Sequence, residues 1–119
     1  MENHLQREIP LLQRINGPDI VPPELLRTAR SYRDACRVAW QLRRAKNLTF
    51  RQLAIEADLV FQHVGDYFCA DDQKHRRSLP GGAVAAVESV LGNSAISQWH
   101  AAQAGLTVLE ELQAMRRAS

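Results

Sequence analysis

The sequence contains only two cysteines, Cys36 and Cys69, which lie far apart with no CxxC spacing. We interpret both as free thiols, because structural disulfides are rare in chains of cytosolic type. The four histidines form no i, i+4 pair and no cluster with cysteine, which are the spacings that zinc sites use. The sequence therefore predicts no metal and no other cofactor.

Long apolar runs are also absent. No stretch approaches the roughly 18 consecutive apolar residues of a membrane-spanning helix. The first residues, Met-Glu-Asn-His, lack the basic and apolar blocks of a secretory signal peptide. We expect a cytoplasmic protein with no membrane partner.

Catalytic motifs are a third absence. The chain has no glycine-rich phosphate loop, no carboxylate cluster and no nucleophile–base pair at a recognisable spacing. We therefore expect that the protein is not an enzyme. Convergence of Cys69, His75 and Asp71 or Asp72 in one cleft is the arrangement that would reverse this expectation.

Aromatic residues make up 6% of the chain and β-branched runs are scarce, whereas Ala, Leu, Arg and Gln are plentiful. These are residues of high helix propensity. A chain of 119 residues, 45% of them hydrophobic, suffices for one domain with a core. We predict an all-α fold, a compact bundle of about five or six helices, with an N-terminal arm over residues 1–23 and a helical domain over residues 24–119.

Helix boundaries follow from apolar spacing and from capping residues. Residues 24–46 read as one long helix, or as two helices broken near Ser31, where Ser31 would cap a restart. Further helices are predicted from Pro80 to Leu91, from Asn93-Ser94 to Gly105, and from a Thr107-x-x-Glu110 capping box onward. Gly92 is expected to close the first of these in the left-handed conformation.

Positive charge gathers in one part of the chain, although the net charge is only +2. Between residues 27 and 51 there are eight basic residues and one acid, Asp34, and the sign reverses over residues 52–73. A solvated helix face usually mixes signs, so the basic block favours phosphate binding as much as simple solvation.

Residues 48–68 predict two short helices joined by a turn at Asp58-Leu59. Thr49, followed by Gln52 three residues on, has the spacing of a capping box at the start of the first helix. Ala54 is small, as it must be where a second helix crosses closely. The apolar positions of the stretch are Leu53, Ala54, Ala57, Leu59, Val64 and Tyr67 or Phe68, and Val64 is the residue of the second helix expected to be buried.

This stretch resembles the helix-turn-helix of the lambda-repressor/Cro-like (XRE-type) DNA-binding proteins of bacteria and phages. The residues that carry the resemblance are Leu48-Thr49, Gln52-Leu53-Ala54 and Val64. It implies that the second helix lies in the major groove of double-stranded DNA while the preceding helix crosses the phosphates. It also implies a sequence-specific, repressor-like transcriptional regulator that acts as a homodimer on a pseudo-palindromic operator.

The resemblance assigns roles to single residues. The base-reading set is Phe61, Gln62, His63 and Asp66, and the phosphate-binding set is Arg43, Arg44, Lys46, Thr49, Arg51, Lys74, Arg76 and Arg77. Gln62 is the best reader, because its amide can donate to N7 and accept from N6 of one adenine. Phe61 can contact a thymine methyl group.

Four residues depart from the family pattern. Asp58 stands at the turn where glycine is common, and aspartate tolerates the left-handed conformation that is needed there. Val60 replaces a Ser or Thr cap, so Asp58 or a water must cap the second helix. Phe50 replaces a phosphate-binding glutamine, and Gly65 suggests close backbone approach to another helix or to DNA.

The alternative function is a protein-interaction module on the same fold, such as an antitoxin or a phage-encoded inhibitor of a host protein. In that interpretation Phe50, Phe61 and Phe68 are core or interface anchors. The predicted dimer interface consists of Trp99, Leu106, Leu109, Leu112 and Met115. The same side chains would serve equally well to close the core of one chain.

Overall fold

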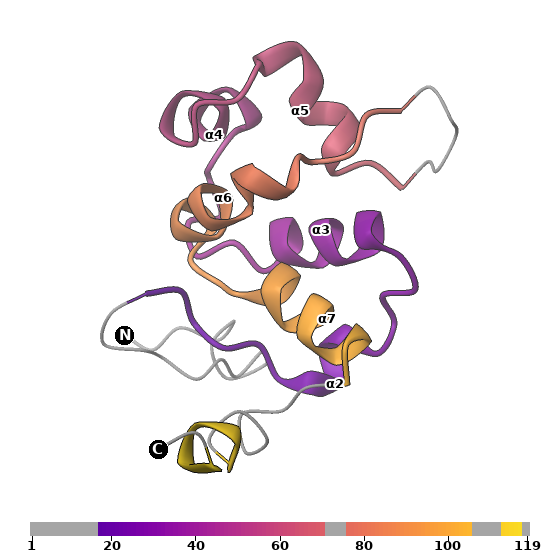
Figure 1. Cartoon of the computed structure of the whole chain (residues 1–119). Helices are drawn as coiled ribbons and strands as arrows, with labels where there is room; N and C mark the ends of the chain where they lie inside the picture. Colours follow the sequence, from indigo (N-terminus) through magenta and orange to yellow (C-terminus); the bar gives the residue numbers. More distant parts are fainter. Residues whose placement is uncertain (1–16, 71–75, 106–112, 118–119) are drawn as a thin grey trace, which may run out of the picture.

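The computed structural model describes residues 17–70, 76–105 and 113–117 (Figure 1). Its elements are α2 (Pro23–Leu26), α3 (Tyr32–Gln41), α4 (Phe50–Glu56), α5 (Phe61–Tyr67), the 3-10 helix η1 (Gly81–Ala83), α6 (Val84–Leu91) and α7 (Ala95–Gln103). Residues 113–117 are also helical, and no strand occurs within the described ranges. An all-α fold is thereby confirmed for this part of the chain. None of its helices is long and apolar enough to cross a bilayer.

The chain leaves helical geometry between α2 and α3. Ser31 has an extended backbone, and its hydroxyl accepts a hydrogen bond from the backbone N–H of Asp34 at 3.1 Å. This bond satisfies one of the donors that the start of a helix leaves open. Of the two predicted alternatives, the break near Ser31 is correct, and α3 ends at Gln41, before the predicted end at Lys46.

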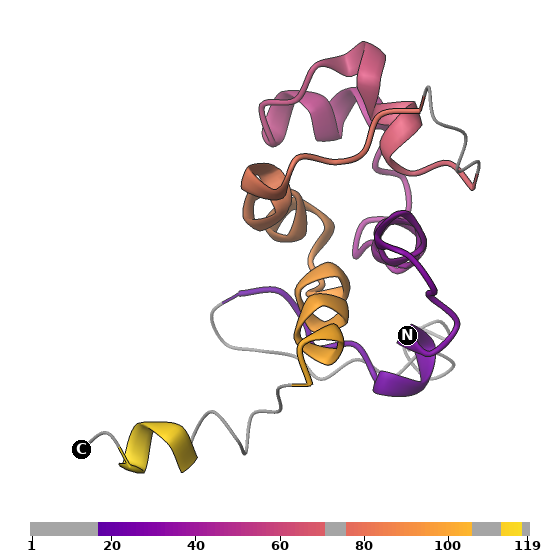
Figure 2. The same ribbon diagram turned by 45° about the vertical axis from the view of Figure 1, so that its right-hand side comes forward.

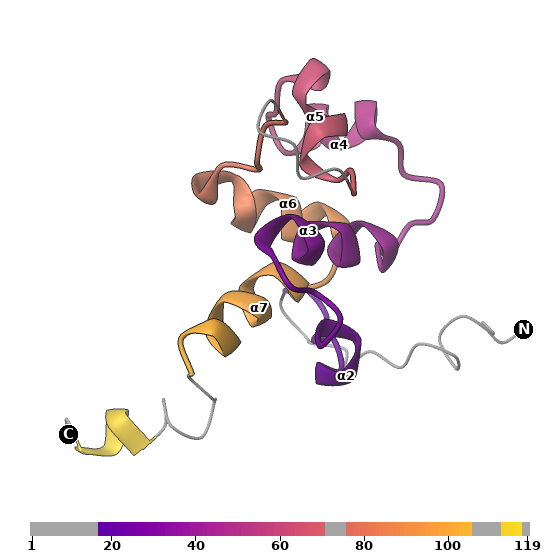
Figure 3. The same ribbon diagram turned by 90° about the vertical axis from the view of Figure 1, so that its right-hand side faces the viewer.

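The helices lie in three tiers. In all three views α4 and α5 lie together at one end, α3 and α6 cross the middle, and α7 and α2 lie at the other end (Figure 1, Figure 2 and Figure 3). The middle tier packs on both others, since α3 contacts α5 as well as α7, and α6 contacts α4 as well as α7. The two short helices α4 and α5 are thus presented at one end of the molecule.

The core runs through all three tiers. Its fully buried side chains include Val21, Cys36, Leu53, Val64, Val87, Leu91 and Ile96. Between α3 and the α4–α5 end lies an aromatic cluster in which the ring of Phe50 is 4.6 Å from that of Trp40 and 6.0 Å from that of Phe68. Phe68 is therefore a core residue, one of the two roles anticipated for it, and Phe50 packs half-buried against the core.

Residues 19–21, part of the predicted arm, run along the start of α7. The N–H of Asp19 donates to the carbonyl of Gly92 at 2.8 Å, and the carbonyl of Asp19 accepts from the N–H of Ser94 at 2.9 Å. The amide of Gln98 satisfies both backbone groups of Val21, at 2.8 and 2.7 Å. Val21 is fully buried, so this segment is part of the folded unit.

Gly92 ends α6 in the left-handed conformation, with φ 84°, as predicted. A Cβ at this position would lie 2.9 Å from the Cβ of Arg44, closer than real Cβ contacts allow. The carbonyl of Gly92 also accepts a hydrogen bond from the guanidinium of Arg44 at 3.2 Å. Both the backbone conformation and the space therefore require glycine.

We expect Gly92→Ala to lower the free energy of unfolding by about 1–2 kcal/mol through the left-handed backbone alone. Displacement of Arg44 adds to that loss. Gly82→Ala is the matched control, because a Cβ at Gly82 meets no atom within 4 Å. Urea denaturation measures the free energy of unfolding of both variants. An equal loss of stability in Gly82→Ala and Gly92→Ala would contradict the conclusion that Gly92 must be glycine.

Candidate nucleic-acid interface

The first helix of the candidate site, α4, begins at the predicted capping box. The hydroxyl of Thr49 accepts from the backbone N–H of Gln52 at 3.1 Å, and the side-chain oxygen of Gln52 accepts from the N–H of Thr49 at 3.0 Å. The two bonds satisfy two donors at the helix start reciprocally. Leu53 and Ala54 are buried on the inner face of α4, as predicted.

The turn from α4 to α5 is tight. Asp58 adopts the left-handed conformation, with φ 57°, and the N–H of Leu59 donates to the carbonyl of Ala54 at 2.8 Å. The expected tolerance of Asp58 for this backbone is confirmed. Of the two caps expected for α5, Asp58 is wrong, since Val60 lies at the N-cap position before Phe61 and no side chain forms a cap bond there.

Helix α5 has one buried face and one exposed end. Val64 and Tyr67 are buried, whereas Phe61 and Gln62 in its first turn are exposed and His63 is half-buried. A Cβ at Gly65 would meet nothing within 4 Å, so no other described helix approaches it closely. The predicted base readers Phe61 and Gln62 thus lie together on the surface.

Arg51, on the first turn of α4, contacts the first turn of α5. Its guanidinium lies over the ring of Phe61, 4.4 Å from the ring centroid. Arg51 itself is exposed, so charge and ring form one exposed unit across the two helices. Nearby, Ile55 is 74% exposed and Val60 is 52% exposed, which adds apolar surface to this end.

Two of the predicted phosphate ligands, Arg43 and Lys46, bind carbonyls at the end of α3. Arg43 lies over the ring of Trp40 at 4.2 Å and donates to the carbonyls of Trp40 and Lys46 at 3.0 and 2.8 Å. The ammonium of Lys46 donates to the carbonyl of Gln41 at 2.8 Å. Burial, followed by the charge of Arg43, lowers the pKa of Lys46. Cations are favourable at this end of a helix, where carbonyls lack partners.

Arg44 joins the middle tier to the N-terminal segment. Its guanidinium pairs with the carboxylate of Asp19 at 3.1 Å, and its own backbone N–H donates to the carbonyl of Leu91 at 2.7 Å. The Arg44 side chain is nonetheless 60% exposed. A guanidinium has five donors, so this pairing leaves some of them directed outward.

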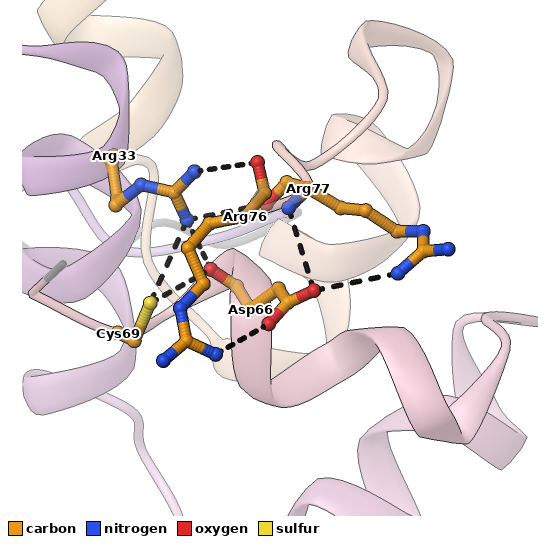
Figure 4. Close-up of polar contacts among 5 residues, drawn as sticks. All are labelled: Arg33, Asp66, Cys69, Arg76 and Arg77. Carbon is orange, nitrogen blue, oxygen red and sulfur yellow. Dashed lines mark hydrogen bonds and ion pairs between the residues drawn. The ribbon is translucent and has the colours of Figure 1, made fainter. Parts of the chain in front are cut away.

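Arg33, one of the eight basic residues between residues 27 and 51, has a structural role that the sequence did not predict. It is buried on α3, and its guanidinium donates to the carbonyl of Asp66 at the end of α5, and to those of Arg77 and Arg76 at 3.2 and 3.4 Å (Figure 4). The sulfur of Cys69 lies 3.8 Å from Nη1 of Arg33, the nitrogen that also donates to the carbonyls of Asp66 and Arg77. One local signal exists, because Arg33 lies three residues before Cys36, which is buried on the same helix.

The carboxylate of Asp66, a predicted base reader, turns toward two predicted phosphate ligands (Figure 4). It pairs with Arg76 at 3.1 Å and with Arg77 at 3.6 Å, and it also accepts from the N–H of Arg77 at 3.4 Å. The hydrogen bond from Arg76, above all, lowers the pKa of Asp66, while burial acts in the opposite direction. The three side chains thus neutralise part of each other's charge.

The predicted dimer residues fall into two groups. Trp99 donates its indole N–H to the carbonyl of Ala29 of the same chain at 3.1 Å, and Met115 is 66% exposed. Leu106, Leu109 and Leu112 lie outside the described residues, as do Lys74 and the acids Asp71 and Asp72.

Among the described side chains no group of three or more histidines, cysteines or acids has the placement of a metal site.

No protein family, curated protein or solved structure matches this chain.

We expect Arg33→Met to lower the free energy of unfolding by about 2–3 kcal/mol, because it removes a buried guanidinium and leaves the carbonyls of Asp66, Arg76 and Arg77 without this donor. Arg37→Met is the matched control on the same helix, since Arg37 is half-exposed and makes one 3.6 Å pair with Asp34. That pair is worth less than about 1 kcal/mol. Chemical denaturation compares the two variants, and similar losses would refute a central role for Arg33.

The ion pairs of Asp66 predict a pH-dependent stability. Because its folded pKa lies below the unfolded value, their stabilisation is complete above the unfolded pKa and is lost as the pH falls through the folded pKa. Asp66→Asn should therefore destabilise the protein at pH 7, by an amount that shrinks below about pH 4. Asp58→Asn removes an exposed carboxylate as a control. A loss that stays constant across this pH range in thermal unfolding would contradict the prediction.

Proposed function

We propose that the protein is a sequence-specific, double-stranded-DNA-binding regulator that inserts the first turn of α5 into the major groove. The observation that carries the proposal is the division of α5: Val64 and Tyr67 anchor it in the core, while Phe61 and Gln62 at its start are exposed. A helix fixed in this way presents side chains to base edges without having to unfold. Gln62 supplies the paired donor and acceptor that an adenine edge requires.

The basic residues around α5 support this proposal through phosphate contacts. Arg51 is exposed beside the reading turn, and the side chain of Arg77, which pairs with Asp66 of α5, is 58% exposed; Arg44, on the middle tier, is 60% exposed. Such side chains can hold their internal carbonyl or carboxylate on one side and a phosphate on the other. Contacts of this kind position the protein without reading sequence.

The oligomeric state belongs to the same proposal. A repressor-like protein of this size reads a pseudo-palindromic site as a homodimer, whose two-fold axis places two reading helices one turn of DNA apart. Regulation of transcription would then follow from occupancy of the site, since dimer formation and DNA binding are coupled through protein concentration.

A second function is favoured by one observation. Ile55, Val60 and Phe61 are exposed large apolar side chains, and all three belong to α4, α5 or the turn between them. Exposed apolar groups gathered at one end are also typical of protein interfaces. A protein-interaction module on this fold is therefore the alternative, and DNA binding separates the two.

The test of DNA binding uses fluorescence anisotropy on a duplex selected from a random pool and on unrelated duplexes, at about 50 and 200 mM salt. Gln62→Ala should cost about 1–3 kcal/mol on the selected duplex only, whereas Arg51→Ala should weaken binding to every duplex and reduce the salt dependence. Arg27→Ala is the control for charge, because Arg27 follows α2 at the opposite end of the molecule (Figure 1). Folded protein that binds no duplex at about 50 mM salt would overturn the proposal.

A further inference from the structure

The exposed side of α4 carries its charges in an order that does not stabilise the helix. Arg51 lies in the first turn, Glu56 is the last helical residue, and Asp58 follows in the turn toward α5. A helix favours acids at its start and cations at its end, because the dipoles of its peptide groups are aligned. All three side chains are exposed, and no ion pair joins any of them to another residue in the described part of the chain. The stability of α4 therefore does not account for these charges.

Apolar side chains lie among the charges. Ile55 is 74% exposed and lies one helical turn after Arg51 on the same face of α4. Val60 and Phe61, at the start of α5, are 52% and 40% exposed, and the guanidinium of Arg51 lies over the ring of Phe61 at 4.4 Å. Arginine and aromatic residues are enriched where proteins contact each other. We call this surface the α4–α5 face, which consists of Arg51, Ile55, Glu56, Asp58, Val60 and Phe61.

The charge pattern of the α4–α5 face is complementary to itself. Ile55 lies four residues after Arg51 and three residues before Asp58, so it is near the midpoint between opposite charges. A two-fold axis at Ile55, perpendicular to α4, makes the α4 helices of two copies antiparallel and brings each Arg51 to the acids of the other copy. Every contact then occurs twice, as in other two-fold interfaces. Each Arg51 also lies at the carboxyl end of the other α4, where a cation is favourable.

The acids decide which kind of partner suits this part of the surface. Exposed Glu56 and Asp58 repel a polyanion, whereas they attract a guanidinium. A second copy of the chain supplies such a guanidinium at the matching distance, together with a second Ile55 for the apolar centre.

We propose that the α4–α5 face binds a second copy of this chain through an antiparallel contact between the two α4 helices. Ile55 and Phe61 form the apolar centre, and Arg51 pairs with Glu56 or Asp58 across the two-fold axis. Three exposed apolar side chains per copy make a small interface, so the pairing is weak and depends on protein concentration.

This pairing differs from the homodimer proposed for an operator, in which the first turn of α5 stays open to DNA. Gln62 directly follows Phe61, so a second copy that covers Phe61 also covers Gln62. The second copy and DNA therefore compete for the same end of the molecule. Self-association through the α4–α5 face is nevertheless independent of the proposed DNA binding and is measured without DNA.

Sedimentation velocity of the full-length protein tests the pairing, at concentrations from about 1 μM to about 1 mM. The average mass should rise from that of one chain toward that of two. Ile55→Gln should raise the dissociation constant at least about tenfold, because it removes the apolar centre from both copies. Met115→Gln is the matched control, because Met115 is 66% exposed and lies in the helical residues 113–117, outside the α4–α5 face. It should leave the dissociation constant unchanged.

Charge reversal tests the antiparallel arrangement. Arg51→Glu and Glu56→Arg should each weaken self-association by about tenfold, because like charges then meet twice across the axis. An equimolar mixture of the two variants should recover the dimer, since opposite charges face each other again at both contacts. Each substitution places on α4 a charge that the helix dipole favours, so both variants should stay folded, which circular dichroism checks.

Every outcome is decisive. The mass of a single chain at all concentrations up to about 1 mM overturns the proposed pairing and leaves the proposed DNA binding in place. A dimer that survives Ile55→Gln, or that is lost in Met115→Gln, lies on another surface and also overturns it. Loss of the dimer in both charge variants without recovery in their mixture overturns the antiparallel arrangement. Failure to bind any DNA duplex, by contrast, overturns the proposed function alone.

Discussion

The guanidinium of Arg33 is the contact on which the arrangement of this fold depends. It brings a buried positive charge to the carboxyl end of α5, where backbone carbonyls have no partner within the helix, and extends to the carbonyls of residues 76–77. Three segments distant in sequence, α3, α5 and the return toward α6, are thereby fixed to one point. The charge is compensated by carbonyl dipoles and by the end of the helix dipole, so burial of Arg33 becomes favourable.

The same principle recurs for the other cations of the basic block. Arg43 and Lys46 close the end of α3, and Arg44 joins the middle tier to Asp19. The basic block between residues 27 and 51 therefore contributes to the fold through bonds within the chain, whether or not it also binds a ligand. A polyanion can therefore bind only the outward-facing donors of these side chains. Arg51 is different, because its guanidinium contacts the ring of Phe61 and not a backbone carbonyl.

Helix boundaries could be predicted from the sequence more accurately than the partners of the charged side chains. Capping boxes, apolar spacing and glycine caps are local, so Thr49, Ser31 and Gly92 were placed correctly. The partners of Arg33 and of the Asp66 carboxylate lie ten or more residues away in the sequence, and no local pattern encodes them. For the same reason the sequence did not show that Phe50 packs half-buried against Trp40 and Phe68 while Phe61 is exposed.

The pairing of Val21 with Gln98 has a kinetic consequence. These residues are 77 positions apart, and the side chain of Gln98 takes the place of a neighbouring strand for one residue of extended chain. Contacts of such long sequence separation form late, because the chain between them must first be ordered. Closure of the fold is therefore a non-local step, as are the contacts of Arg33, and we expect the molecule to fold more slowly than a helical protein held by local contacts alone.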